Sequence, residues 1–421
     1  MDEYSLICSV CKTPYHGSGP LFICEQCGGQ LEPLATLSSQ AARDVIQSGC
    51  NSGLWDYASL LPVPKDIHPF SLGEGNTPLV KAKNLESFLG LSTLFLKNET
   101  LNPTGTYKDR FSSLALSLKH TRPSANDSKA CHAVALGSAG NAAASVSAYA
   151  ALAQIPCFVL LPPGAVAERG WQIQNYGAHL IHVEHTIDDC IQMVNQGKTL
   201  FGWTSLTTNI SMNPLACEGY KTIAYEIGKQ LSYSMPDWIV VPVGGAALLC
   251  KIYQGCQQML SLGLIDRMPR FVGAQAAACA PLVDAFEKSL TVPQKWPGTP
   301  HTVAFAIADV CVYDGVTALD VLQKTNGCAI AASEEEILEA THLIASKEGI
   351  LSEPSSACTL ACVKKMLHAG LIQPSERVLC VLSGSGLRDL RLLSDTNPTV
   401  PYVHFHDFSA LRRMVEPYLP G

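Results

Sequence analysis

Charged and aromatic residues are scarce in this 421-residue chain, at 15% and 7% of the sequence. Lys and Arg nowhere gather in a cluster of five or more, and the formal net charge is −7. The composition therefore gives no support for binding to nucleic acid or to an anionic membrane. Hydrophobic residues make up 47% of the chain, which excludes a disordered protein and predicts extensive buried surface.

Long hydrophobic runs are also missing. The most apolar stretch, residues 146–161, is interrupted by Gln154 and Pro156 before it reaches the length of a membrane span. The opening sequence MDEYSLICSV has no signal-peptide pattern, so we expect a soluble cytoplasmic protein. The 17 cysteines are an odd number, and a disulfide framework is not expected in a large chain without export signals.

Two nucleotide-binding signatures are absent as well. No segment matches the P-loop pattern, and the nearest approach to GxGxxG is SGSGLR at residues 383–388. That segment lies near the end of the chain and lacks the expected strand–helix–strand context. The sequence therefore argues against NAD and ATP as ligands.

What the chain does contain is a repeated alternation of apolar strand, small-residue loop and helix. This pattern predicts an α/β protein with parallel sheets, whose ligands bind where strands end. Four such loops combine glycine with small polar or methyl residues, and they are NPTGTYK at 102–108, GSAGN at 137–141, VGGAA at 243–247 and SGSG at 383–386. Because helix N-termini bind phosphate and carboxylate, four such loops indicate a cofactor and a substrate that carry several negative charges.

Lys108 stands between one of these loops and a predicted helix. A lone lysine in a first helical turn is usually exposed and has no chemical role. A lysine that is desolvated there has a lowered pKa, and its free amine can form an imine. The four loops together favour this second interpretation.

The motifs GEGNTPL at 73–79 and KNETLNPTGTYKDR at 97–110 resemble those of fold-type-II pyridoxal 5′-phosphate (PLP) enzymes. Within that group the chain is most similar to the threonine synthases. The resemblance covers nearly the whole sequence. It implies an α/β fold with two open parallel or mixed sheets and a small N-terminal zinc ribbon.

The resemblance also implies roles for individual residues. Lys108 would be both the catalytic residue and the Schiff-base lysine, Asn141 would bond the cofactor's phenolic oxygen, and Ser383 would face its pyridine nitrogen. The cofactor phosphate would lie on Gly244, Gly245, Ala246 and Ala247. The implied substrate-binding residues are Thr104, Ser138, Ala139, Gly140, Arg169 and Asn213.

Four cysteines near the N-terminus have metal-ligand spacing. Cys8-x2-Cys11 and Cys24-x2-Cys27 are two matched pairs, which can place four thiolates around Zn²⁺. Buried thiols or a redox pair are the competing interpretations. CEQCGGQLEP also resembles the zinc-ribbon head of many threonine synthases, and a metal with four thiolate ligands would be structural.

We expect the following division of the chain. The predicted parts are a zinc ribbon at 1–35, a connecting arm at 36–72, a large PLP domain at 73–110 plus 237–395, a small α/β domain at 111–236, and a C-terminal tail at 396–421.

The resemblance implies a PLP-dependent lyase that converts O-phospho-L-homoserine and water to L-threonine and phosphate, and a homodimer. At one position the chain differs from the pattern of the threonine synthases, because Ala216 in NPLACEGYKT stands where many of them have arginine. This difference leaves the identity of the substrate open. Cysteate synthesis from O-phosphoserine, or threonine/serine dehydration, are the alternative reactions. A cofactor-less scaffold with a zinc-ribbon docking module is the non-enzymatic alternative.

Overall fold

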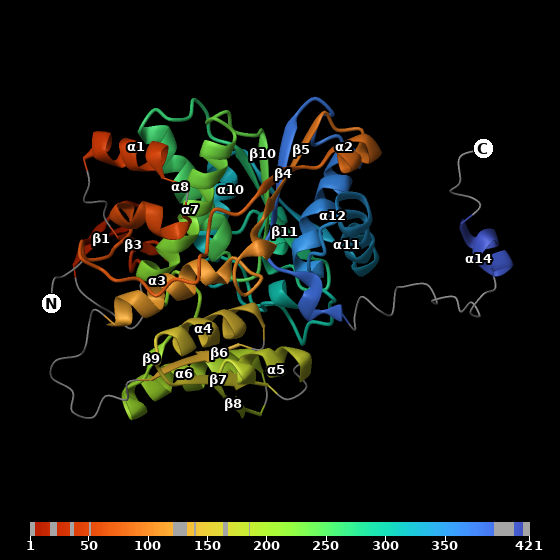
Figure 1. Cartoon of the computed structure of the whole chain (residues 1–421). Coiled ribbons are helices and arrows are strands. Elements are labelled where there is room, and N and C mark those ends of the chain that lie inside the picture. The colour runs from red at the N-terminus through yellow and green to blue at the C-terminus, as the bar shows by residue number, and fades with distance from the viewer. Residues whose placement is uncertain are drawn as a thin grey trace. The chain divides into compact units, whose positions relative to one another are not determined.

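The computed structural model describes residues 5–16, 23–33, 38–49, 52–120, 133–138, 140–162, 167–184, 186–390 and 408–415. Residues 1–388 form one compact unit (Figure 1), and residues 389–421 form a second that contains helix α14 (Phe408–Val415). Across the described ranges, every helix is too short or too polar to cross a membrane.

The larger sheet has six strands in the order β12-β11-β10-β13-β5-β4. Its strands are β12 (Cys328–Ala332), β11 (Arg270–Ala276), β10 (Trp238–Pro242), β13 (Arg377–Leu382), β5 (Thr93–Asn98) and β4 (Leu79–Lys81). All neighbours pair in parallel except β4, which runs antiparallel to β5 at the edge.

Both faces of this sheet are covered by helices, which explains why its strands are continuously apolar. In β10, Ile239 and Val241 belong to one buried cluster, while Trp238 and Val240 belong to another on the opposite face. The first cluster contains residues of α7 (Pro214–Gln230), α8 (Ala247–Ser261), α9 (Pro281–Glu287) and α10 (Gly315–Lys324). The second contains residues of α2 (Lys83–Leu89), α11 (Glu334–Glu348) and α12 (Pro354–His368).

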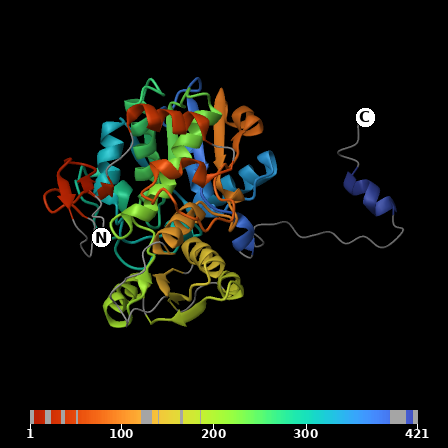
Figure 2. The same cartoon turned by 60° about the vertical axis from the view of Figure 1, so that its left-hand side comes forward.

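A smaller sheet has four parallel strands in the order β8-β7-β6-β9. With its helices it lies below the larger sheet in the views of Figure 1 and Figure 2. Its strands are β8 (His179–His182), β7 (Cys157–Leu161), β6 (Val134–Gly137) and β9 (Thr204–Ser205), and its helices are α4 (Asn141–Leu152), α5 (Ala167–Asn175) and α6 (Ile187–Phe201). Ala135 and Leu160 pack with Cys190 and Val194 of α6 on one face.

The N-terminal segment forms a three-stranded antiparallel sheet in the order β2-β1-β3. Its strands are β1 (Ser5–Cys8), β2 (Pro14–His16) and β3 (Leu31–Pro33). This sheet contacts the main body through side chains, because Ser9 Oγ lies 3.1 Å from Thr317 Oγ1 and Gln254 donates to Glu32. Helix α1 (Ser39–Ser48) and the 3₁₀ helix η1 (Leu54–Leu60) follow it.

The mixed six-stranded sheet, the parallel four-stranded sheet and their helical layers confirm the predicted α/β fold class. Helices begin at the ends of three of the four predicted loops, since α3 starts at Lys108, α4 at Asn141 and α8 at Ala247. The division into domains and tail given above stays a prediction.

One buried ion cluster joins the elements around helix α3 (Lys108–His120). Arg110 pairs with Glu99 at 2.8 Å and with Glu226 of α7 at 2.5 Å, and Lys97 of β5 pairs with Glu226 at 2.7 Å. Thr77 adds a 2.5 Å bond to Glu99. Burial alone would raise the pKa of Glu226, but Arg110 and Lys97 outweigh it and lower that pKa to about 2.

We expect Glu226→Gln to destabilise the fold by about 3–5 kcal/mol, because Lys97 and Arg110 would keep buried charges without a full counter-charge. The pKa of Glu226 is lowered by folding from 4.5, so its contribution is present above that pH and is lost as the pH falls toward 2. Denaturant unfolding at neutral pH measures the change. The surface pair Asp320–Lys324 supplies the control, since Asp320→Asn should change stability by less than about 1 kcal/mol. Equal losses in both variants would contradict the structural role of the cluster.

Candidate cofactor and active site

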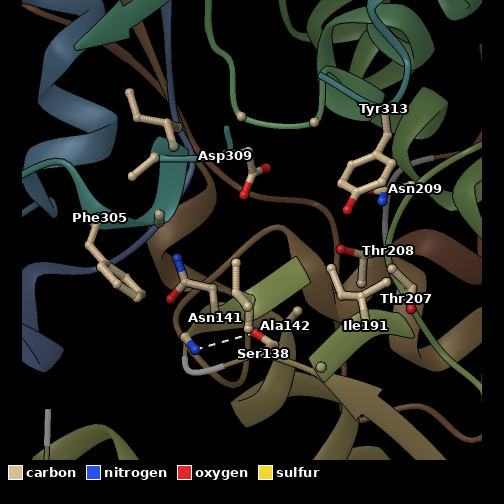
Figure 3. A pocket seen from close by; sticks show the side chains of 18 of the residues that line it. Ser138, Asn141, Ala142, Ile191, Thr207, Thr208, Asn209, Phe305, Asp309 and Tyr313 are labelled. Carbon is tan, nitrogen blue, oxygen red and sulfur yellow. Dashed lines mark hydrogen bonds between the residues drawn. The ribbon is translucent and has the colours of Figure 1, made fainter. Parts of the chain in front are cut away.

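A cavity of about 430 Å³ lies where the predicted loops meet. It is lined at Lys108, at the start of α4, at the turn before α8 and after strand β13 (Figure 3). The predicted site residues that line it are Lys108, Ser138, Gly140, Asn141, Gly244, Gly245, Ala246, Ala247 and Ser383. The structure therefore brings together residues that are up to 275 positions apart, from Lys108 to Ser383, in one cavity.

Lys108 is the first residue of α3, and its amine is held inside the cavity. Nζ donates a 2.8 Å hydrogen bond to Thr208 Oγ1. The same atom lies 4.8 Å from the centre of the Tyr107 ring and 5.6 Å from that of Tyr220. Two aromatic faces and one hydroxyl therefore fix the amine where a ligand in the cavity could reach it.

Asn141 is the first residue of α4, and hydrogen bonds at both its nitrogen and its oxygen fix the orientation of its side-chain amide. Nδ2 donates to both carboxylate oxygens of Glu353, at 3.0 and 2.9 Å. Arg388, in the 3₁₀ helix η4 (Gly386–Arg388), donates from Nη1 to Asn141 Oδ1 and from Nε to Gln172 at 2.8 Å. This chain of bonds identifies which end of the Asn141 amide is the donor.

The turn before α8 has no room for side chains at its two glycines. A Cβ at Gly244 would lie 2.5 Å from Asp309 Oδ2, and one at Gly245 would lie 2.9 Å from Asn209 Oδ1. Ala246 adopts a left-handed φ of 75° as the residue before the helix. The two glycines let Asp309 and Asn209 approach the turn, and the N-terminus of the 15-residue helix that follows offers backbone N–H groups, which suit a phosphate.

Ser383 follows β13 and closes the cavity on another side. Its Oγ lies 3.1 Å from Ser356 Oγ, in the EPSSA segment at the start of α12. A serine hydroxyl can donate to or accept from a ring nitrogen, so this position fits the neutral partner expected for a pyridine.

The remaining predicted substrate residues are placed outside the described lining of the cavity. Thr104 donates from its hydroxyl to Asp109 at 2.5 Å, and Asn213 donates to the Thr207 carbonyl at 2.7 Å. Arg169 packs its guanidinium 4.7 Å from the Phe305 ring, which does line the cavity. Ala139 lies outside the described residues. The substrate roles of these four residues stay predictions.

Several lining residues were not singled out from the sequence. Thr208 and Asn209 follow β9, so the rule that ligands bind at the carboxyl ends of parallel strands could have found them. Asp309 lies after a short 3₁₀ helix, η3 (Phe305–Ile307), within an apolar segment that gave no signal. Among the described lining residues Lys108 is the one cation, and its charge lowers the pKa of Asp309. Glu353, which bonds Asn141, also lines the cavity.

A second cluster lies in the N-terminal sheet. The Sγ atoms of Cys8, Cys11, Cys24 and Cys27 all lie within 4.8 Å of one another. Cys8 and Cys27 approach to 3.5 Å, as do Cys11 and Cys24. Four thiolates on a tetrahedral zinc ion would be about 3.8 Å apart, so this arrangement is compatible with the ion.

An amine at one helix start, an oriented amide at a second, a glycine turn at a third and a serine hydroxyl all meet in one cavity. These groups suit a cofactor with an aldehyde, a phenolic oxygen, a phosphate and a ring nitrogen. Residues 70–384 match the family described as pyridoxal-phosphate dependent enzyme. The chain belongs to this family, and its cofactor is PLP.

Several threonine synthases have sequences similar to that of this chain. A threonine synthase from Methanocaldococcus jannaschii is 38% identical over 388 residues, which are 91% of this chain and 92% of that protein. A threonine synthase from Mycobacterium tuberculosis is 38% identical over 336 residues, 79% of this chain and 87% of that protein.

Solved structures with low sequence identity share the fold. A pyridoxal 5′-phosphate-dependent aspartate racemase aligns with a TM-score of 0.65 at 18% identity, covering 86% of this chain and 100% of that one. Maize serine racemase aligns with a TM-score of 0.61 at 20% identity, covering 81% and 93%.

We expect Arg388→Met to weaken PLP binding about tenfold, because the Asn141 amide would lose the bond that fixes its oxygen. Arg388→Lys should restore much of the affinity, since a lysine keeps one charged donor. Titration of the visible absorbance with PLP measures both. If Arg388→Met bound PLP as tightly as the wild type, the proposed orientation of Asn141 would be wrong.

Proposed function

We propose that this chain is a threonine synthase, which converts O-phospho-L-homoserine and water to L-threonine and phosphate. The observation that carries the proposal is the 38% identity to a threonine synthase over 91% of this chain and 92% of that relative. The grouping of Lys108, Asn141, Ser383 and the glycine turn around one cavity supports it.

In this proposal the bound cofactor withdraws electrons from the substrate's α-carbon and so makes the neighbouring protons removable. Lys108 removes the proton from Cα and then moves a proton at Cβ. The Thr208 hydroxyl accepts a hydrogen bond from the Lys108 amine and positions it for both steps. Asn141 and Ser383 hold the cofactor ring in register with Lys108. Ser138, Ala139 and Gly140, with the N-terminus of α4, bind the substrate carboxylate.

The phosphate of O-phospho-L-homoserine needs cationic or dipolar groups to bind it. The scarcity of cations in the described cavity lining favours a second candidate reaction. Ala216, which stands where many relatives have arginine, is buried in the first turn of α7. Among the described lining residues Lys108 is the one cation. These observations favour a substrate without a phosphate, so dehydration of threonine or serine is the second candidate. Cysteate synthesis from O-phosphoserine stays an alternative that the missing arginine does not favour.

We further propose that Cys8, Cys11, Cys24 and Cys27 bind a structural Zn²⁺, which the spacing of their Sγ atoms supports. A cytoplasmic location and a homodimer are also proposed. The location is supported by the composition, and the dimer by the resemblance to the threonine synthases.

The purified protein should be yellow, with an absorption band near ~410–420 nm from the imine between Lys108 and PLP. It should release phosphate from O-phospho-L-homoserine and form threonine in equal amount. Lys108→Ala should lose the band and at least about 10³-fold of the rate, because it removes both the linkage and the proton carrier. Thr208→Val, which removes only the bond to Lys108, should keep the band and lose a smaller part of the rate.

The outcome that contradicts the threonine synthase proposal is a yellow protein that forms no threonine from O-phospho-L-homoserine. Formation of 2-oxobutyrate from threonine would then support the second candidate, and phosphate release from O-phosphoserine would support the cysteate alternative. A protein that stays colourless with added PLP would contradict the role of Lys108.

Metal analysis of protein purified without chelators should find about one zinc per chain. Cys24→Ser should lose the zinc and lower the thermal midpoint, yet keep the visible band, because the metal would be structural and its ligands do not line the cavity. Cys328→Ser, a half-buried cysteine of β12, is the control and should keep the zinc. Zinc-free wild-type protein with an unchanged thermal midpoint would disprove the site.

A further inference from the structure

The carboxylate of Asp309 lies on the glycine turn that precedes α8. A Cβ built on Gly244 would come 2.5 Å from Asp309 Oδ2, and one built on Gly245 would come 3.6 Å from the same atom. The backbone N–H of Gly245 favours the charged form of this carboxylate and lowers its pKa. An acidic side chain therefore shares the turn to which the cofactor phosphate is assigned (Figure 3).

Two anions on one turn repel each other unless one of them takes up a proton. Burial raises the pKa of Asp309 to about 6, although Lys108 and the Gly245 N–H lower it. Asp188 of α6 adds to the rise. The other titratable groups that interact with Asp309 are Tyr107, Cys279, Cys311 and Tyr313, which are neutral at pH 7 because burial raises the pKa of each.

The surroundings offer the phosphate little other charge compensation. Lys108, the cation among the described lining residues, would be consumed by its linkage to the cofactor. Gly244, Gly245, Ala246 and Ala247 supply backbone N–H groups but no charged side chain. A neutral carboxyl on the turn would remove the repulsion and add an O–H donor in the same place.

We propose that Asp309 is a further member of the phosphate cradle, and that it binds the PLP phosphate as the protonated acid. PLP binding then takes up one proton at the Asp309 carboxylate, and the new O–H donates to a phosphate oxygen. The proton comes from the solvent, the O–H of Asp309 is the one covalent bond that this step forms, and no bond of the phosphate group breaks. This inference depends on the cofactor and not on which amino acid the enzyme uses.

The experiment is a titration of PLP into the full-length chain, followed by visible absorbance, between pH 6 and pH 8. Asp309→Asn keeps the size of the side chain and an N–H donor but cannot ionise. The wild type should bind PLP progressively more weakly than Asp309→Asn as the pH rises. The ratio of their dissociation constants should grow by about tenfold or more across the range, because one proton is linked to binding. Ionisation of PLP itself is common to both proteins and cancels in this ratio.

Pyridoxal, which has no phosphate, distinguishes the phosphate from the rest of the cofactor. For pyridoxal the ratio of wild-type to Asp309→Asn dissociation constants should not change with pH. Asp309→Ser serves if the asparagine variant does not fold, and it should also abolish the extra pH dependence. Asp320→Asn, a surface carboxylate paired with Lys324, should behave as the wild type.

Two results would overturn the proposal. The first is a ratio for PLP that stays constant from pH 6 to pH 8, which would mean that Asp309 leaves the turn as a carboxylate. The second is an equal pH effect with pyridoxal, which would assign the proton to another part of the cofactor.

Discussion

The pairing of Arg110 with Glu99 and Glu226 is the constraint on which the active site depends. Arg110 is two residues beyond Lys108 on α3, and its guanidinium is completely buried. Burial opposes its charge, but Glu226 and Glu99 hold its pKa above the ordinary value. A buried charge that is paired on two sides tolerates little movement, because separation from either partner would leave part of the buried charge without a counter-charge. The first turn of α3, and with it the base of the Lys108 side chain, is thereby held in place.

The same cluster explains why the motif around Lys108 is long. Glu99 follows β5, Lys97 belongs to that strand, and Thr77 comes from the GEGNTPL segment and bonds Glu99. The residues that carry the chemistry and those that hold it in place are therefore interleaved in one stretch of sequence. Lys97, Glu99 and Arg110 do not line the cavity, and their effect on Lys108 acts through α3.

Much of the fold and site could be predicted from the sequence, because both follow local rules. Continuous apolar strands followed by glycine-rich turns predicted parallel sheets, and the carboxyl-end rule predicted that the four glycine-containing loops would lie where ligands bind. The family resemblance then pointed to Lys108, Asn141, Gly244 and Ser383 within these loops. Asp309 could not be predicted in this way, since it reaches the glycine turn from a segment without a strand. Nor could the bond between Arg388 and Asn141, because its partners are 247 positions apart and no local pattern joins them.

The described lining of the cavity has few cationic side chains to share between the cofactor and an anionic substrate. A cofactor linked to Lys108 takes up the one cation among the described lining residues, so dipoles of the lining must contribute to holding an anionic substrate. Arg169, the predicted substrate residue that packs on Phe305 of the cavity wall, is a cation beside that lining. The N-termini of α4 and α8 provide backbone N–H groups. Thr208 and Asn209 provide a hydroxyl and an amide across the cavity from Asn141 (Figure 3). Preorganised dipoles stabilise charge well in a site that excludes water, but they do so without the long-range attraction of an arginine. Ala216 supplies no charge in the first turn of α7, so it bears on capture of a substrate phosphate more than on proton transfer by Lys108.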